Sequence, residues 1–151
     1  MIEYQCFMYD KLSALFSDKY RYKSLFMQLP MSTGIFIVED NLFYQQLIAR
    51  ELESFGGPVF FYTSGEHCLA NLLRRPSVVV LDYNLDGAIN GLETLQEIRK
   101  FDPSIFVVLF SSQKEVYSHE NQSKYGSFDF LEKKEHSFHM LKELLQEKVI
   151  A

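Results

Sequence analysis

The chain has 151 residues, 47% of them hydrophobic, and a formal net charge of −5. This length suits one domain that buries a core without the help of cross-links. The negative charge argues against nucleic acid as the main partner, because phosphate backbones are bound by clusters of Lys and Arg, and the sequence contains no such cluster.

Residues 1–33 are mixed in composition and rich in aromatic residues, and they end in a break at residues 29–33. Their apolar positions 7, 8, 12, 15 and 16 fit one face of a helix. Two interpretations stay open for this N-terminal extension: an extra helix, or an overlong start, since Met31 is itself a sensible first residue. We expect the domain proper to occupy residues 34–151.

Short apolar runs alternate with helical patterns from Gly34 onward. The expected strands are residues 35–38, 59–62, 78–81, 105–110 and 128–131. A first helix is expected to begin at Asn41 as its N-cap, to end at residues 56–57, and to carry on one side Phe43, Leu47, Ile48 and Leu52. Further helices are expected at 64–73, 92–99 and 114–123, and a last one carries Phe138, Leu141, Leu144, Leu145 and Val149. This alternation predicts an α/β fold with a parallel sheet covered on both faces.

Cys6 and Cys68 are the two cysteines. Two are too few for a disulfide framework and their spacing fits no metal site, so both are interpreted as ordinary thiols of a reducing compartment. The longest apolar run, residues 105–110, is far shorter than a membrane span. Polar residues interrupt the N-terminus where a signal peptide would need an apolar stretch. We expect a cytoplasmic protein with no membrane partner.

Polar side chains stand where four of the expected strands end. The first strand is followed by Glu39 and Asp40, the third by Asp82, the fourth by Ser111 and Ser112, and the fifth by Glu132, Lys133 and Lys134. Ligands of parallel sheets bind beyond the carboxyl ends of the strands, so these residues are expected to meet at one edge. A single carboxylate at a strand end often only caps the next helix, but such residues at four ends favour a site.

The residue types at this edge suit phosphoryl transfer. Three close carboxylates repel one another and stay ionised only beside a cation, and oxygen ligands favour Mg²⁺. Lys133 offers a positive charge, and Ser111 a hydroxyl donor, to a phosphoryl group. Asp82 is the natural acceptor, because a carboxylate can act as a covalent nucleophile.

Segment 34–151 resembles the receiver domain of two-component response regulators, and its length is similar to the single-domain chemotaxis type. Four ordered motifs carry the resemblance, in residues 35–41, 79–87, 107–112 and 126–133. The resemblance implies a flavodoxin-like, doubly wound sheet of five parallel strands in the order 2-1-3-4-5, with helices on both faces. It also implies a phosphorelay protein that binds Mg²⁺.

The resemblance assigns a role to each matching residue. Glu39 and Asp40 are the acidic pair that binds the metal, Asp82 is the phosphorylation site and a further ligand, and the backbone carbonyl of Asn84 is the last protein ligand. Lys133 is the invariant lysine of the family.

Two more residues are implied to respond to phosphorylation, Ser111 as the switch hydroxyl and Phe130 as the switch aromatic. The phosphoryl donor would be a histidine kinase or a histidine phosphotransfer protein. The output would pass to a downstream protein through the helix at 114–123, the fifth strand and the last helix, or a homodimer would form there. No output domain is expected after the last helix, and the chain is expected to hydrolyse its own acyl phosphate slowly rather than to be a dedicated enzyme.

Three positions depart from the family pattern. Lys134 stands where a cis Pro usually follows the lysine, so either the loop differs or a strained cis bond is retained. Asp86 stands where Pro is common after the acceptor, and Ser127 replaces a usual Ala. None of these changes removes a catalytic group.

Two other functions compete with that of a phosphoacceptor. A phosphorylation-independent interaction module of the same fold would need none of the strand-end residues. A phosphatase with an Asp nucleophile usually has a second acid two residues later, where this chain has Asn84, and a cap for which the chain lacks length.

Overall fold

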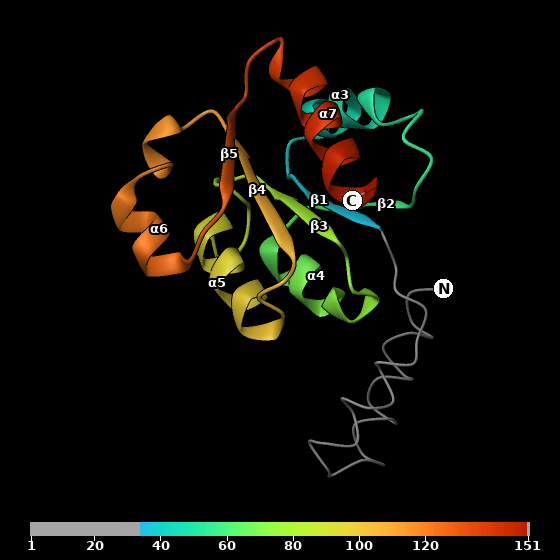
Figure 1. Cartoon of the computed structure of the whole chain (residues 1–151). Coiled ribbons are helices and arrows are strands. Elements are labelled where there is room, and N and C mark those ends of the chain that lie inside the picture. Colours follow the sequence, from blue (N-terminus) through green and yellow to red (C-terminus); the bar gives the residue numbers. More distant parts are fainter. Residues whose placement is uncertain (1–33, 151) are drawn as a thin grey trace, which may run out of the picture. The chain divides into compact units, whose positions relative to one another are not determined.

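The apolar runs form one five-stranded sheet, and the computed structural model describes residues 34–150 of the chain (Figure 1). The strands are β1 (Ile35–Val38), β2 (Val59–Tyr62), β3 (Val78–Leu81), β4 (Phe106–Ser111) and β5 (Asp129–Glu132). All neighbouring pairs are parallel, and the order is β2-β1-β3-β4-β5. The predicted fold and strand order are confirmed, although β4 and β5 each begin and end one residue later than predicted. The predicted N-terminal extension, residues 1–33, lies outside the described residues.

Helices cover both faces of this sheet (Figure 1). On one face α3 (Leu42–Glu51) and α7 (Ser137–Ile150) bury Ile48, Leu141 and Leu145. The other face is covered by α4 (Gly65–Ala70), α5 (Gly91–Phe101) and α6 (His119–Tyr125). Successive residues of a strand point to opposite faces, so a strand buried on both sides must be apolar throughout. This explains the uninterrupted apolar runs of β1 and β3.

The first helix begins as predicted but is shorter, and one of the apolar residues on its predicted apolar side is exposed. The Asn41 side chain caps α3 by accepting hydrogen bonds from the backbone N–H groups of Phe43 and Tyr44, at 2.9 and 3.4 Å. The helix ends at Glu51, well before Gly56. Phe43, which the sequence analysis places on the same side of the helix as Ile48 and Leu52, is 63% exposed, whereas those two residues are buried.

The expected helix at 114–123 is not one helix. Residues Lys114–Val116 form a single 3₁₀ turn, and α6 starts only at His119. The break is stabilised by Ser118, whose hydroxyl accepts a hydrogen bond from the Asn121 N–H at 3.2 Å. Ser118 therefore ends the 3₁₀ turn and begins a new helix. The segment is too polar for apolar periodicity to predict this break.

The loop after β5 differs from the family pattern rather than retaining a cis bond. The Lys133–Lys134 bond is trans, as are the other peptide bonds in the part of the chain that the structure describes. The Lys134 carbonyl accepts a hydrogen bond from the Ser137 N–H at 3.0 Å, which leads the chain into α7.

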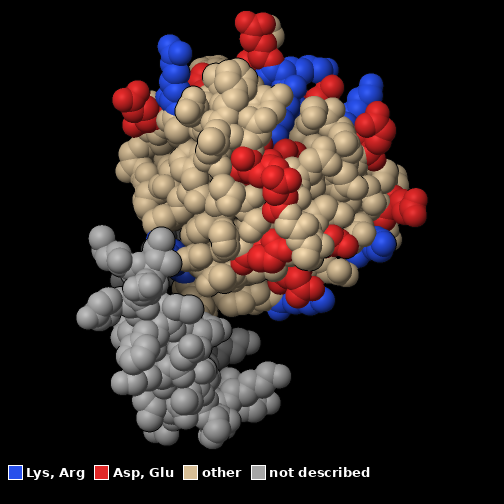
Figure 2. Space-filling view, turned by 180° about the vertical axis from the view of Figure 1, so that it is seen from behind, with Lys and Arg blue, Asp and Glu red and all other residues tan. Residues whose placement is uncertain are grey.

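Charge is unevenly distributed over the face shown in Figure 2. Asp and Glu side chains gather across its middle, and most Lys and Arg side chains lie toward its margin. That face therefore offers no broad basic patch of the kind that a nucleic-acid backbone requires. Within residues 34–150, no helix has the length and apolar character needed to cross a membrane.

Candidate functional site

Backbone hydrogen bonds just past the strand ends bring the predicted site residues to one edge of the sheet. The Asp82 N–H donates to the carbonyl of Val38, the residue before Glu39, at 2.9 Å. The Lys133 N–H donates to the Ser111 carbonyl at 3.0 Å. The parallel ladder thus aligns the ends of β1, β3, β4 and β5, as the sequence predicts.

Three carboxylates and one ammonium meet in this pocket. Glu39, Asp40 and Asp82 each place a carboxylate oxygen within 4.8 Å of the other two. The Lys133 side chain is only 2% exposed, and its Nζ lies 2.5 Å from Glu39 Oε2 and 2.7 Å from Asp82 Oδ2. One ammonium cannot balance three carboxylates, so the pocket keeps an excess of negative charge. This set of oxygen donors fits a small divalent cation.

The two members of the acidic pair have different surroundings. Glu39 is buried, and both its carboxylate oxygens are engaged, Oε2 by Lys133 and Oε1 by the Asn41 N–H at 3.2 Å. Asp40 is half-buried and therefore more accessible. Burial raises the pKa of the Glu39 carboxyl; Lys133 opposes that rise, and the charge of Asp82 adds to it.

The raised pKa of Glu39 predicts a pH dependence of stability that Glu39→Gln should reduce. In the unfolded chain, a Glu carboxyl has a pKa of about 4.3. Between that pH and the raised pKa, the folded state keeps a proton that the unfolded state has released. The free energy of unfolding contributed by this group therefore falls as pH rises through this window, and the loss is complete above the raised pKa.

Urea unfolding of both proteins in metal-free buffer, from pH 4 to pH 8, would measure this effect. We expect the wild-type protein to lose stability relative to Glu39→Gln as pH rises. If the difference between the two proteins stays constant across the range, burial does not raise the pKa of Glu39.

The loop after β3 holds Asp82 and touches Asp40. The Asn84 N–H lies 3.4 Å from Asp82 Oδ1, which is a weak contact. The Asp86 N–H donates to Asp40 Oδ2 at 3.1 Å. A Pro at position 86 has no N–H to donate. The departure from the family pattern thus gives Asp40 a backbone partner.

Gly91, at the start of α5, supports the same loop and was missed by the sequence analysis. A Cβ at this position would lie 2.2 Å from the Asp82 carbonyl oxygen, so no larger residue fits without moving the backbone. A second support comes from Glu66, whose Oε1 accepts a hydrogen bond from the Ala88 N–H at 2.7 Å. A Gly directly after a helix-capping Asn is only a weak signal of this close packing. No local pattern in the sequence predicts the contact between Glu66 and Ala88.

Ser111 and Phe130, the predicted switch pair, lie in different environments. Ser111 is fully buried, and its Oγ accepts a hydrogen bond from the Gln113 N–H at 3.3 Å. Phe130 is half-buried and stacks on Tyr117, with ring centroids 5.7 Å apart and an interplanar angle of 19°. Because Tyr117 is 53% exposed, the Phe130 ring is not enclosed in the core.

Tyr44 is a further neighbour of the site that the sequence analysis missed. Lys133 Nζ lies 4.3 Å from the centroid of its ring, which is cation–π geometry. Tyr44 in turn stacks on Phe138, and Phe138 meets Phe110 edge-on. Aromatic side chains from α3, α7 and β4 thus form a continuous group beside Lys133. An aromatic residue five positions after Glu39 was the only available signal in the sequence.

The fold and the site together define a class: a doubly wound α/β domain with an acidic pocket that contains a lysine at the carboxyl edge of its sheet. The sequence profile of the response regulator receiver domain matches residues 35–145. The chain belongs to this family, and the predicted resemblance is confirmed.

Individual relatives agree with this assignment. The chain is 32% identical over 105 residues to the nitrogen assimilation regulatory protein NtrX of Azorhizobium caulinodans, and 27% identical over 103 residues to the transcriptional regulatory protein CssR of Bacillus subtilis. Each alignment covers 68% of this chain, but only 23% of NtrX and 45% of CssR. The chain thus spans less than half the length of these relatives.

Solved structures show the same fold. The response regulator TrrA of Thermotoga maritima, solved in complex with Mg(2+)-BeF, matches with a TM-score of 0.67 and 24% identity over 76% of this chain and 96% of that one. NtrX of Brucella abortus matches with a TM-score of 0.64 and 28% identity over 78% of this chain and 27% of that one.

Proposed function

We propose that this receiver domain accepts a phosphoryl group on Asp82 from a histidine kinase or a histidine phosphotransfer protein. The observation that carries the proposal is the pocket itself, in which three carboxylates lie close together and the buried ammonium of Lys133 pairs with two of them, Glu39 and Asp82. A domain that only bound a partner would gain nothing from this arrangement, since buried carboxylates in excess of their cation cost stability.

Each residue of the pocket has a part in the transfer. Asp82 Oδ1, the oxygen that Lys133 does not hold, forms a bond to phosphorus while the phosphorus–nitrogen bond of the donor's phosphohistidine breaks and its electron pair stays with the imidazole. Lys133 neutralises charge on the phosphoryl oxygens, and the Ser111 hydroxyl donates a hydrogen bond to one of them. Transfers of this kind depend mainly on positioning and on charge neutralisation. The domain is not a dedicated enzyme, because its own side chain is the acceptor.

The pocket also fits Mg²⁺, which would supply more positive charge for the phosphoryl oxygens. Asp40, Asp82 and the Asn84 carbonyl would hold the ion directly. Glu39 would act through water, because both its oxygens are engaged by protein groups and Mg²⁺ keeps much of its hydration shell.

Incubation of the full chain with acetyl phosphate and Mg²⁺, followed by intact-mass measurement, tests the proposed function. We expect the mass of one phosphoryl group to be added, and the label to be lost in acid or base. A parallel sample with excess chelator is the control and should gain no mass. An unchanged mass in the presence of Mg²⁺ would favour the phosphorylation-independent interaction module.

We also propose that residues 34–151 form the working domain without residues 1–33. The support is that all five strands and every pocket residue follow Gly34. A chain that starts at Met31 is expected to fold and to be labelled as fast as the full chain. Insolubility or loss of labelling, checked by circular dichroism and by mass, would instead make the first segment part of the core or of the site.

The output is proposed to pass through Phe130 to the surface of α6, β5 and α7. When the Ser111 hydroxyl turns from the Gln113 N–H to a phosphoryl oxygen, it leaves space behind it. The half-buried Phe130 ring can move inward to fill this space, which is a packing change between two discrete states.

Amide chemical shifts recorded with and without beryllofluoride would detect this switch. We expect shifts in β5 and α6 in addition to those of the acidic pocket. If residues 112–140 stay silent apart from Lys133, Phe130 is a fixed residue and not a switch.

A further inference from the structure

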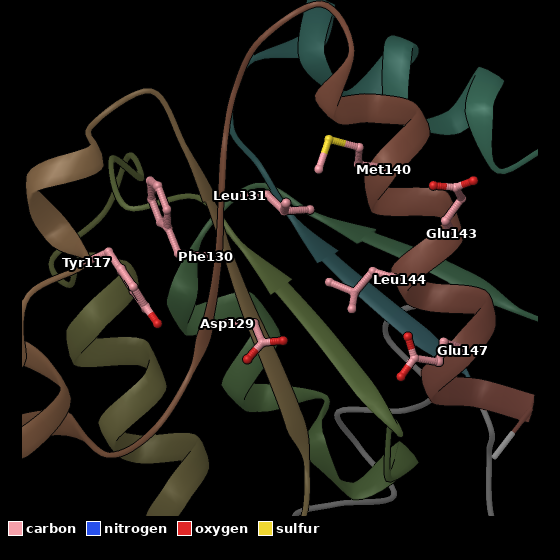
Figure 3. A pocket seen from close by; sticks show the side chains of 8 residues that line it. All are labelled: Tyr117, Asp129, Phe130, Leu131, Met140, Glu143, Leu144 and Glu147. Atoms are coloured by element: carbon pink, nitrogen blue, oxygen red, sulfur yellow. The ribbon is translucent and has the colours of Figure 1, made fainter.

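Helix α4 reaches the loop after Asp82 from the half of the sheet opposite to the proposed output surface. That surface surrounds β5, with Phe130 and Tyr117 on one side of the strand and a groove lined by α7 on the other (Figure 3). Helix α4 instead packs against β1, β2 and α5, and β2 and β5 are the two edge strands of the sheet. A side chain of α4 that contacts the loop can therefore act on the phosphoacceptor pocket without belonging to the output surface.

The Glu66 side chain crosses from the first turn of α4 to the backbone of this loop. Its Oε1 accepts a hydrogen bond from the Ala88 N–H at 2.7 Å, 22 positions later in the chain. Its Oε2 is buried, and a Cβ built on Gly87 would lie 2.6 Å from it, so the loop backbone passes directly over the carboxylate. A Glu in the first turn of a helix needs no such partner, because its charge already favours the helix N-terminus. The contact thus goes beyond stabilising α4.

The start of α4 is a fixed base for this side chain. A Cβ on Gly65 would lie 2.1 Å from Thr94 Oγ1, so α4 and α5 are in direct contact next to Glu66. Thr94 is fully buried, and its hydroxyl donates a hydrogen bond to the Asn90 carbonyl at 2.8 Å. Glu66 therefore holds Ala88 to a rigid part of the fold.

The same loop touches the phosphoacceptor pocket two residues before Ala88. The Asp86 N–H donates to Asp40 Oδ2 at 3.1 Å, and the Asn84 carbonyl is a proposed Mg²⁺ ligand. Residues 84, 86, 87 and 88 are exposed, so hydrogen bonds rather than packing fix their backbone.

The Glu66 carboxylate is well suited to hold a backbone N–H. Hydrogen bonds from its own N–H and from that of Ala88 lower the pKa of the carboxyl. It is therefore ionised at neutral pH, and an ionised acceptor makes a stronger hydrogen bond than a neutral one.

We propose that Glu66 is a positioning residue of the phosphoacceptor site: by holding the Ala88 N–H, it keeps the loop in the conformation in which Asp40 and the Asn84 carbonyl can share one Mg²⁺ ion. This inference rests on the proposed function, which assigns Mg²⁺ to that pocket. Glu66 acts through the loop backbone and not on the phosphoryl group itself. The length of its side chain matters as much as its charge, since the carboxylate must span the distance from α4 to the loop.

Three substitutions of Glu66 separate length from charge. Glu66→Ala removes the acceptor. Glu66→Asp keeps the charge but is one methylene shorter, so its carboxylate should fail to reach the Ala88 N–H. Glu66→Gln keeps the length and has an amide oxygen that can accept the hydrogen bond, but it is neutral. We expect Glu66→Gln to resemble the wild-type protein more closely than Glu66→Asp does.

Amide hydrogen exchange of the metal-free full chain, followed by NMR, measures the contact itself. We expect the Ala88 amide to exchange at least about tenfold faster in Glu66→Ala and Glu66→Asp than in the wild-type protein, because the hydrogen bond that protects it is lost. The amides of β3 should keep their wild-type exchange rates, since the sheet does not depend on this contact.

Isothermal titration with Mg²⁺ measures the effect on the site. Glu66→Ala and Glu66→Asp should bind Mg²⁺ roughly tenfold more weakly, at the low end of the loss typical of residues that orient metal ligands. The unfolding temperature of the metal-free protein should change little, because Ala88 is exposed and its N–H can bond to water. A residue that only stabilised the fold would give the opposite pattern, a lower unfolding temperature with unchanged Mg²⁺ affinity.

Glu97→Ala is the control for the loss of one negative charge. Glu97 is exposed on α5, where it pairs with Lys100 at 2.6 Å. Its removal should leave both the exchange of Ala88 and the Mg²⁺ affinity at wild-type values. Equal loss of affinity in Glu97→Ala, or wild-type exchange or affinity in Glu66→Ala, would overturn the proposal. So would a Glu66→Asp variant that matches the wild-type protein while Glu66→Gln does not, because charge rather than position would then be the cause.

Failure of this proposal and failure of the proposed function give different results. Labelling of the wild-type protein by acetyl phosphate tests the proposed function without any change at Glu66. If the wild-type protein is labelled and Glu66→Ala binds Mg²⁺ equally well, only the role of Glu66 is overturned. If Mg²⁺ binding depends on Glu66 but the wild-type protein takes no label, only the phosphoacceptor assignment is overturned. A wild-type protein that binds no Mg²⁺ overturns both.

Discussion

Asp82→Asn is expected to abolish labelling by acetyl phosphate while the domain stays folded. Asn has nearly the same shape as Asp, but its amide is not a nucleophile that could hold a phosphoryl group. The fold should tolerate the change, because Lys133 still pairs with Glu39 at 2.5 Å. Removal of one of three crowded carboxylates also relieves repulsion in the metal-free pocket. Intact mass reports the label, and thermal unfolding reports the fold.

Asp86→Asn is the matched control for this prediction. Asp86 lies on the same loop and is exposed, and its contact to Asp40 comes from the backbone N–H, which the substitution retains. It should be labelled like the wild-type protein. Continued labelling at a single acid-labile site in Asp82→Asn would show that another residue is the acceptor.

Asp40→Ala is expected to lower the affinity for Mg²⁺ by roughly a hundredfold, and Glu39→Ala by about tenfold or less. Asp40 is the more accessible carboxylate and would ligate the ion directly. Glu39 is held by Lys133 and by the Asn41 N–H, so it would contribute mainly through its charge and through water. Isothermal titration with Mg²⁺ would give both affinities.

The stability of Asp40→Ala without metal is a second test, because it measures the repulsion among the same carboxylates. Removing Asp40 takes away one of the carboxylates that lie within 4.8 Å of each other. We expect Asp40→Ala to be at least as stable as the wild-type protein in chelator and to gain little stability from Mg²⁺, whereas ligand binding should stabilise the wild-type protein. Unchanged Mg²⁺ affinity in both variants would rule out this pocket as the metal site.

Local sequence determined the sheet and the residues at its edge. The four-residue apolar runs of β1 and β3 are buried on both faces, and only a strand at the centre of a covered sheet needs that pattern. Parallel strands all end at the same edge, so the position of Glu39, Asp82 and Lys133 just after their strands was enough to predict that they meet. Asn41 could also be identified as a cap, because capping depends on residues only two or three positions away.

Tertiary structure alone decided features that depend on distant neighbours. Phe43 has the same helical spacing as the buried residues Ile48 and Leu52, yet it is 63% exposed. The ring of Tyr44 meets the ammonium of Lys133, 89 positions later in the chain, and its place five positions after Glu39 is too weak a signal to predict this contact. In the same way, Asp129 joins Glu143 and Glu147 only because β5 and α7 line one groove. Periodicity in the sequence predicts which side of a helix or strand is buried. Which distant residues that side contacts depends on how the strands and helices are arranged in three dimensions.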